Sequence, residues 1–272
     1  MQVSRRMIQR LTRSRGIQHD RRPASLSRRV RAGEVVAVRV ARDEATTLDP
    51  VSMELHILYE DTDLLVIDKP AGILVHPSSP RHSRTLAHGV AHHFARMDLR
   101  ARVRPVHRLD RDTSGAVLFA KSDFAHQHLD RQLRQDELTR EYLALVEGAL
   151  APPEGVIDAP IGRDRNDPAR RRVTVGGQPA RTLYTVERVM SGCTLVRARL
   201  ETGRTHQVRV HLAHIGHPVL GDREYGARRA LPGSRHALHS WRVTFRQPRT
   251  NERITVEAPL PGDIEALMEE SG

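Results

Sequence analysis

One short segment of the chain places groups that could do chemistry side by side. Residues His107 to Gly115 read His-Arg-Leu-Asp-Arg-Asp-Thr-Ser-Gly, and an apolar run follows at 116–120. Asp110 thus lies beside arginines and a histidine, and nearby positive charge stabilises the ionised form of a carboxylate. An ionised aspartate in a basic setting can attack or deprotonate a substrate that carries phosphates. The alternatives are an aspartate that only caps a turn, or the neighbouring Asp112 as the reacting carboxylate.

Two later segments combine polar groups with apolar patterning. Residues 140–148 open with Arg140 and contain Tyr142, whose ring offers a flat stacking face and a polar tip. A tyrosine buried in a strand would give the same pattern. In residues 203–212, basic and polar side chains alternate with apolar ones, so one side can line a cleft while the other enters the core. The histidines of this region lack a cysteine or a clear carboxylate set beside them, so we predict no metal site.

The composition indicates a polyanionic partner. The formal net charge is +11, and all but two of the 44 basic residues are arginines, a residue suited to bidentate phosphate contacts. A GC-rich genome would explain the excess of arginine over lysine, but not the net charge. The single cysteine, Cys193, excludes an internal disulfide and a cysteine-based zinc site. With no long apolar segment and no apparent secretory signal, we expect a cytoplasmic protein without a membrane span.

The chain divides into a basic N-terminal unit (1–42), a polar linker (43–51) and a large remainder (52–272). In the first unit, a helix is predicted around Leu11 and short strands at 16–17 and 35–40. A solvated basic arm is the alternative for this unit.

In the remainder, strands and helices follow one another without regular βαβ alternation, which predicts an α+β fold with a mixed, mainly antiparallel central sheet and flanking helices. Predicted strands cover 57–60, 64–68, 116–120, 142–147, 173–175, 182–189, 194–200 and 241–245. Helices are predicted at 85–97, at 124–133 and at the C-terminus, and residues 207–214 fit either a helix or a strand.

Taken together, these segments resemble the RluA-type pseudouridine synthases, which isomerise uridine in RNA. The resemblance rests on blocks that occur in the right order at 58–77, 107–115, 140–148, 177–184, 203–226 and 236–241. It implies a catalytic domain over 52–272 with a deep basic cleft. It also implies that no cofactor is needed, and neither a phosphate-cradling glycine motif nor a dinucleotide fingerprint is present.

The resemblance also implies roles for individual residues. Asp110 is the essential carboxylate, Tyr142 packs against the target base, and Arg209 pairs with Asp110, with Arg204 as the alternative partner. Whether Asp110 bonds to the sugar or removes a sugar proton stays open. The target nucleotide must leave its stack before the chemistry. We predict RNA contacts for six side chains of the catalytic domain: His107, Arg108, Lys69, Arg204, His206 and Gln207.

Residues 1–42 resemble a truncated alpha-L RNA-binding domain, which implies further RNA contacts by Arg5, Arg6 and Arg10. That domain makes large-subunit ribosomal RNA the preferred substrate, with transfer RNA as the alternative, and a monomer is the default expectation. Two other classes stay open. A ribosome-assembly factor that binds RNA without catalysis would tolerate Asp110→Ala. A basic DNA-binding protein would need a recognition-helix motif, and the sequence shows none.

Overall fold

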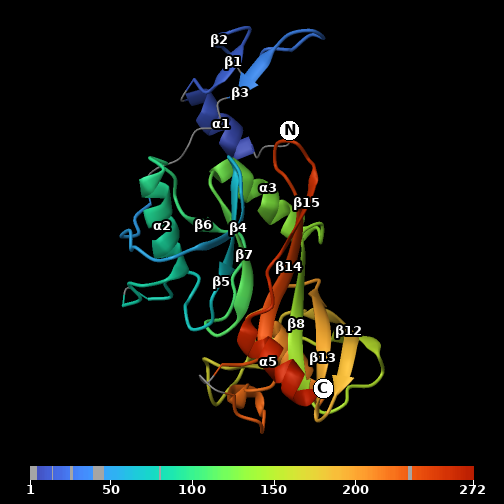
Figure 1. The fold of residues 1–272 in the computed structure, drawn as a ribbon. Helices are drawn as coiled ribbons and strands as arrows, with labels where there is room; N and C mark the ends of the chain where they lie inside the picture. Colours follow the sequence, from blue (N-terminus) through green and yellow to red (C-terminus); the bar gives the residue numbers. More distant parts are fainter. Residues whose placement is uncertain (1–4, 14, 25–26, 39–45, 80, 232–234) are drawn as a thin grey trace.

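A computed structural model describes residues 5–13, 15–24, 27–38, 46–79, 81–231 and 235–272 of the chain. Its main feature is a ten-stranded sheet that runs along the molecule (Figure 1). The strands of this sheet are β4 (His56–Glu60), β5 (Leu64–Lys69), β6 (Arg104–Pro105), β7 (Ser114–Ala120), β8 (Thr139–Glu147), β9 (Glu154–Asp158), β12 (Arg181–Met190), β13 (Cys193–Leu200), β14 (Leu238–Arg246) and β15 (Arg253–Glu257).

The sheet is mixed and mainly antiparallel, as predicted. Its main path is β4-β5-β7-β14-β8-β13-β12-β9, with β6 added to β7 and β15 added to β14. The β7–β14 pair is parallel, and the other pairs of this sheet among the described residues are antiparallel. β7 directly follows residues 106–113, which contain Asp110 and are called the Asp110 segment below. The pairing of β7 with β14 therefore fixes this segment against the middle of the sheet.

At β5 and β7 both faces of the sheet are buried. In β5, Leu65 and Ile67 enter one core cluster, whereas Leu64 and Val66 enter another. Successive side chains of a strand point to opposite faces, so a strand covered on both sides becomes a continuous apolar run. The first cluster contains residues of α2 (Leu86–Arg96), α4 (Gln207–His214) and α5 (Gly262–Ser271), and the second contains residues of α3 (Asp123–Arg134).

The N-terminal unit folds at the end of the molecule opposite to α5 (Figure 1). It contains α1 (Arg5–Arg13) and a three-stranded sheet of β1 (Ile17–His19), β2 (Arg22–Pro23) and β3 (Val36–Val38). Leu11 is fully buried against Phe124 of α3. A solvated arm would not bury this leucine. The proposed linker lies partly outside the described residues, and the domain limits stay a prediction.

A small hairpin packs against α4, formed by β10 (Ile161–Arg163) and β11 (Arg171–Val173). The sequence predicted a strand at 173–175, but the strand ends at Val173. Residues 207–214, which fitted two structures, form a helix. No helix in the described part of the chain is long and apolar enough to cross a membrane.

Candidate active site

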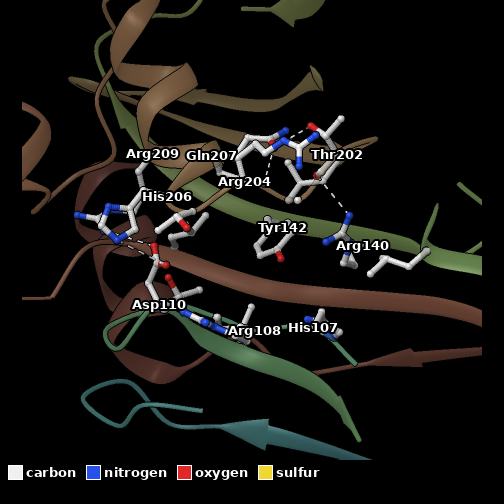
Figure 2. Close-up of a pocket in the computed structure, with 18 of the residues that line it drawn as sticks. His107, Arg108, Asp110, Arg140, Tyr142, Thr202, Arg204, His206, Gln207 and Arg209 are labelled. Atoms are coloured by element: carbon white, nitrogen blue, oxygen red, sulfur yellow. Dashed lines mark hydrogen bonds and ion pairs between the residues drawn. The ribbon is translucent and has the colours of Figure 1, made fainter. Parts of the chain in front are cut away.

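A cavity with a volume of about 660 Å³ lies between the segment that contains Asp110, β8 and the start of α4. Its lining is strongly basic. Five arginines contribute to it, namely Arg108, Arg134, Arg140, Arg204 and Arg209. Two carboxylates, Asp110 and Glu201, also line it, whereas Asp112 does not. In the close-up of Figure 2, His206 and Arg209 lie beside Asp110, and Tyr142 lies between this group and Arg140.

Asp110 is held on a short, well-anchored connection between β6 and β7. The side chain of Leu109 is buried beside it, and the backbone N–H of Thr113 donates to the carbonyl of Asp110 at 3.3 Å. Gly115 permits the tight exit from this turn. Its φ is +108°, and a Cβ there would lie 2.2 Å from the carbonyl oxygen of Ser240 on β14. The parallel pairing of β7 with β14 therefore requires glycine at this position.

Arg209 connects Asp110 to a buried ionic cluster. Its Nη1 donates to Oδ2 of Asp110 at 3.3 Å. Its Nε and Nη2 donate to both oxygens of Asp222 at 2.7 and 2.8 Å, and Nη2 also reaches Glu224 at 2.7 Å. Burial acts to lower the pKa of Arg209, but its hydrogen bonds to the buried Asp222 raise that pKa on balance. A permanent positive charge thus faces the Asp110 carboxylate.

His206 lies near the carboxylate oxygen of Asp110 that Arg209 does not contact. Its Nε2 lies 3.8 Å from Oδ1 of Asp110, and its Nδ1 lies 2.8 Å from the hydroxyl of Tyr225. His206 has a left-handed backbone conformation (φ +58°) directly before α4, which directs the start of that helix at the cavity. The sequence predicted that Arg209 pairs with Asp110, whereas it assigned His206 to RNA contact, and the structure places both side chains within 4 Å of the carboxylate.

β8 supplies two side chains to the cavity from one face. Arg140 and Tyr142 are two residues apart and both are buried, as the period of a strand requires. Burial raises the pKa of the Tyr142 hydroxyl, so the phenol stays neutral at ordinary pH. Tyr142 can therefore stack on a base and donate a hydrogen bond, but it is a poor proton acceptor.

Lys69 corrects one prediction. It was expected to contact RNA, but its side chain is fully buried and its Nζ donates to the carbonyl oxygens of Pro70, Ile73 and Arg111 at 2.8–2.9 Å. Burial lowers the pKa of Lys69 to about 7, while the three carbonyls match the three N–H bonds of an ammonium group. Because Arg111 follows Asp110 directly, Lys69 holds the aspartate segment rather than the substrate.

Gln207 and His107, which were also predicted to contact RNA, instead use their polar atoms for contacts within the protein. The amide of Gln207 makes four hydrogen bonds within the protein, to Thr202, Thr182 and the backbone of residues 181 and 204, so its donors and oxygen are already used. The ring of His107 lines the cavity but is buried, and Nε2 accepts from the backbone N–H of Leu118. Burial lowers the pKa of His107 to about 3, so it offers no positive charge to a phosphate.

The remaining predicted contacts differ in how well they can reach RNA. Arg108 lines the cavity, is exposed, and forms no hydrogen bond or ion pair with the residues that the structure describes. Arg204 also lines the cavity, with Nε donating to the carbonyl of Pro179. It does not contact Asp110, and Arg209 does. The side chains of Arg5, Arg6 and Arg10 lie outside the described part of the chain.

Several site residues were not assigned a role from sequence. Asp222, Glu224 and Tyr225 hold Arg209 and His206, yet in the sequence they were only part of a matching block. The sequence shows only three charged residues and a tyrosine between Gly221 and Gly226, and this pattern does not reveal their partners. A spacing compatible with a metal ion occurs at His19, Asp20 and Glu34, in the N-terminal sheet.

Comparison with known proteins shows the family to which the chain belongs. A family model described as RNA pseudouridylate synthase matches residues 63–214. The chain therefore belongs to the RNA pseudouridylate synthase family and is an isomerase that acts on RNA. Together with the relatives described next, this match confirms the resemblance to RluA-type enzymes inferred from the sequence blocks. The α+β fold is confirmed by the structure and by its similarity to solved structures.

Individual relatives cover most of the chain. An RNA pseudouridine synthase of Bacillus subtilis, YhcT, is 46% identical over 88% of this chain and 79% of its own length. The ribosomal large subunit pseudouridine synthase D of Nitrosomonas europaea is 38% identical over 98% of this chain and 80% of its own. The solved structure of human RNA pseudouridylate synthase domain containing 1 superposes with a TM-score of 0.63 at 25% identity, covering 82% of this chain and 97% of that one.

Proposed function

We propose that this pseudouridine synthase acts on uridine in large-subunit ribosomal RNA and that Asp110 is its essential carboxylate. The observation that carries the second part is the setting of Asp110, which is partly exposed in a cavity lined by five arginines and touches the buried Arg209. Glu201, the other lining carboxylate, is paired with Arg181 at 2.6 Å. Of the two carboxylates that line the cavity, Asp110 is therefore the one in contact with Arg209.

The reaction sets clear demands on such a site. The bond between C1′ and N1 of uracil breaks, the base turns, and a bond from C1′ to C5 forms. The hydrogen on C5 leaves as a proton and N1 gains one, so the atoms balance without a cofactor. A carboxylate can assist by bonding to the sugar or by taking a sugar proton while the glycosidic bond breaks.

The cavity suits a nucleotide that has left its stack. Its volume lies within the range of sites that enclose small ligands. An enzyme that works at C1′ must extract the nucleotide first. Arg108 at the exposed rim can stack on a neighbouring base or bind a phosphate, and Arg204 and His206 can contact the RNA further into the cavity. Tyr142 offers its ring to the base.

One observation favours ribosomal RNA over transfer RNA, and a second supports RNA binding outside the cavity. The Nitrosomonas relative, which matches nearly the whole chain, is named for the large ribosomal subunit. In addition, the N-terminal unit carries a basic segment whose Arg28, Arg29 and Arg31 are exposed, as an RNA-binding element requires. We propose that this unit binds RNA outside the cavity.

Tritium release from 5-tritiated uridine tests both parts. Wild type should release tritium from large-subunit ribosomal RNA and not from transfer RNA, and Asp110→Asn should abolish release while RNA binding persists. Asp112→Asn is the matched control, since it removes a carboxylate of the same loop that does not line the cavity. Release by Asp110→Asn at the wild-type rate would refute the role of Asp110. Release only from transfer RNA would refute the substrate assignment.

A further inference from the structure

His206 is hydrogen-bonded at one ring nitrogen and faces Asp110 with the other. A neutral imidazole carries its hydrogen on only one of these nitrogens, and the partner of the first decides what the second presents. Nδ1 lies 2.8 Å from the hydroxyl of Tyr225, and Nε2 lies 3.8 Å from Oδ1 of Asp110. The hydrogen bonds of Tyr225 therefore determine which group faces the carboxylate.

The hydroxyl of Tyr225 is buried and its oxygen already has a donor. The backbone N–H of Arg171, on the β10–β11 hairpin, donates to this oxygen at 3.1 Å. The phenol must place its own hydrogen on an acceptor, because a buried hydroxyl without one is costly. The acceptor within hydrogen-bond reach among the described residues is Nδ1 of His206. Glu224, the other group near Nδ1, lies farther from this nitrogen, at 3.6 Å. Burial raises the pKa of Tyr225, which keeps the hydrogen on the phenol.

Nδ1 is thus an acceptor and Nε2 carries the hydrogen. In this tautomer an N–H bond faces Asp110, whereas the other tautomer would direct a lone pair at the carboxylate and repel it. Asp110 then lies between two donors, with Arg209 on Oδ2 and His206 on the side of Oδ1. The distance of 3.8 Å is longer than a hydrogen bond, but such contacts commonly tighten when substrate binds.

We propose that Tyr225 is a positioning residue that holds His206 as the Nε2–H tautomer, and that His206 uses this N–H to fix the orientation of the Asp110 carboxylate. The inference rests on the proposed role of Asp110. It assigns His206 to the reacting carboxylate rather than to the RNA alone. It also gives the β10–β11 hairpin a part in the site, because its Arg171 N–H determines the direction in which Tyr225 donates.

Two replacements of His206 separate the function of its nitrogens. The amide of glutamine can place an N–H near the position of Nε2, whereas the shorter asparagine reaches only the position of Nδ1. The left-handed backbone at position 206 is tolerated better by asparagine than by glutamine. A purely structural role thus predicts that His206→Asn is the more active variant. The proposed role predicts the opposite, with His206→Gln retaining at least about 10-fold more kcat than His206→Asn.

Tyr225→Phe tests the proposed relay, in which Tyr225 fixes the tautomer of His206 and His206 orients Asp110. In the wild-type background it should lower kcat for tritium release about 10-fold or more, with little change in KM, because the tautomer is no longer fixed. In the His206→Gln background it should have almost no effect, since an amide has no tautomer to fix. Tyr59→Phe is the matched control. It removes a tyrosine hydrogen bond to Asp61 that does not border the cavity, and kcat should not change.

The outcomes are distinct. Wild-type kcat in Tyr225→Phe, an equal loss in both backgrounds, or greater activity of His206→Asn than of His206→Gln would each overturn the relay. The His206 comparison decides the question even where Tyr225→Phe does not fold. Asp110→Asn is assayed in parallel. Full activity of that variant would refute the proposed function, whereas an inactive Asp110→Asn with unaffected Tyr225 and His206 variants would refute only the relay.

Discussion

Arg209 gives Asp110 one N–H and directs most of its guanidinium elsewhere. Nη1 lies 3.3 Å from Oδ2 of Asp110, whereas Nε and Nη2 hold both oxygens of the buried Asp222. The arginine is therefore anchored by Asp222, and Asp110 contacts a cation whose position does not depend on the substrate. The carboxylate keeps lone pairs available while its charge is balanced.

Arg209→Lys should disturb this arrangement although the charge is retained. A lysine cannot form the bidentate pair with Asp222 and reach Asp110 at once. We expect kcat to fall about 10-fold or more, and the free energy of unfolding to fall by about 3 kcal/mol because Asp222 is left buried with a poorer partner. Tritium release and urea denaturation would measure the two effects. Arg229→Lys is the control. Its ion-pair partner Glu270 is exposed, so this change should alter stability by less than about 1 kcal/mol.

Lys69→Met should act through the Asp110 segment and not through RNA affinity. It removes the donor from three carbonyls, including that of Arg111. We expect a loss of about 3 kcal/mol of unfolding free energy and a lower kcat, with the Kd for RNA unchanged. Lys121→Met is a matched control, because Lys121 is equally buried but binds Glu60 and the carbonyl of Asp61. It should lower stability and spare kcat. A large rise in the Kd of Lys69→Met for RNA would contradict our account and would support the prediction that Lys69 contacts RNA.

The sequence predicted the strands whose apolar residues are continuous or alternate clearly, such as β5 and β7. It missed β9 and β15, because these short strands carry charged residues at both ends and each pairs with a single neighbour. It left residues 207–214 open because apolar residues there alternate. In the structure the helix begins at Gln207, whose side chain binds residues distant in sequence, and distant partners are not visible in a local pattern.

The same limit applies to the site. Asp110, Tyr142 and Arg209 could be selected from motifs, and the structure brings them to one cavity. Lys69 was misassigned because charge alone suggested an exposed side chain. Only the fold shows that three carbonyls surround its ammonium group. The relay through Tyr225 depends on a hairpin 54 residues earlier in the chain.

Gly115→Ala should be one of the most harmful small substitutions in the protein. A Cβ at this position would overlap backbone atoms of Ser240, which cannot move aside as a flexible side chain could. In addition, φ is +108°, which is unfavourable for any residue with a Cβ. We expect a loss of about 3 kcal/mol or more in unfolding free energy, combining overlap with backbone strain. Gly192→Ala is the control. Its φ of +73° is also unfavourable, but nothing lies within 4 Å of the added atom, so only about 1 kcal/mol of strain is expected. Equal losses in the two variants, measured by urea denaturation, would show that the close approach to β14 is unimportant.

Buried histidines should make the protein sensitive to acid. Burial lowers the pKa of His107 to about 3, that of His236 to about 2 and that of His239 to about 4. Below pH 6.5 the unfolded chain therefore binds protons at these positions while the folded protein does not, so stability is complete above about pH 6.5 and is lost as the pH falls toward the folded values. Each histidine contributes a slope of about 1.4 kcal/mol per pH unit in this window.

His107→Gln tests this account, because its amide oxygen can still accept the N–H of Leu118. Urea denaturation between pH 5 and pH 8, a range chosen at about one unit or more above the usual carboxylate pKa values, would measure the slope. The unfolding free energy of the variant should fall less steeply on acidification than that of wild type. The difference between the two slopes should correspond to about one bound proton. At pH 8 the slopes of both proteins should converge, because histidine is neutral there in folded and unfolded chains alike. An unchanged slope in the variant would mean that His107 binds a proton equally well in both states and that its burial does not keep it neutral.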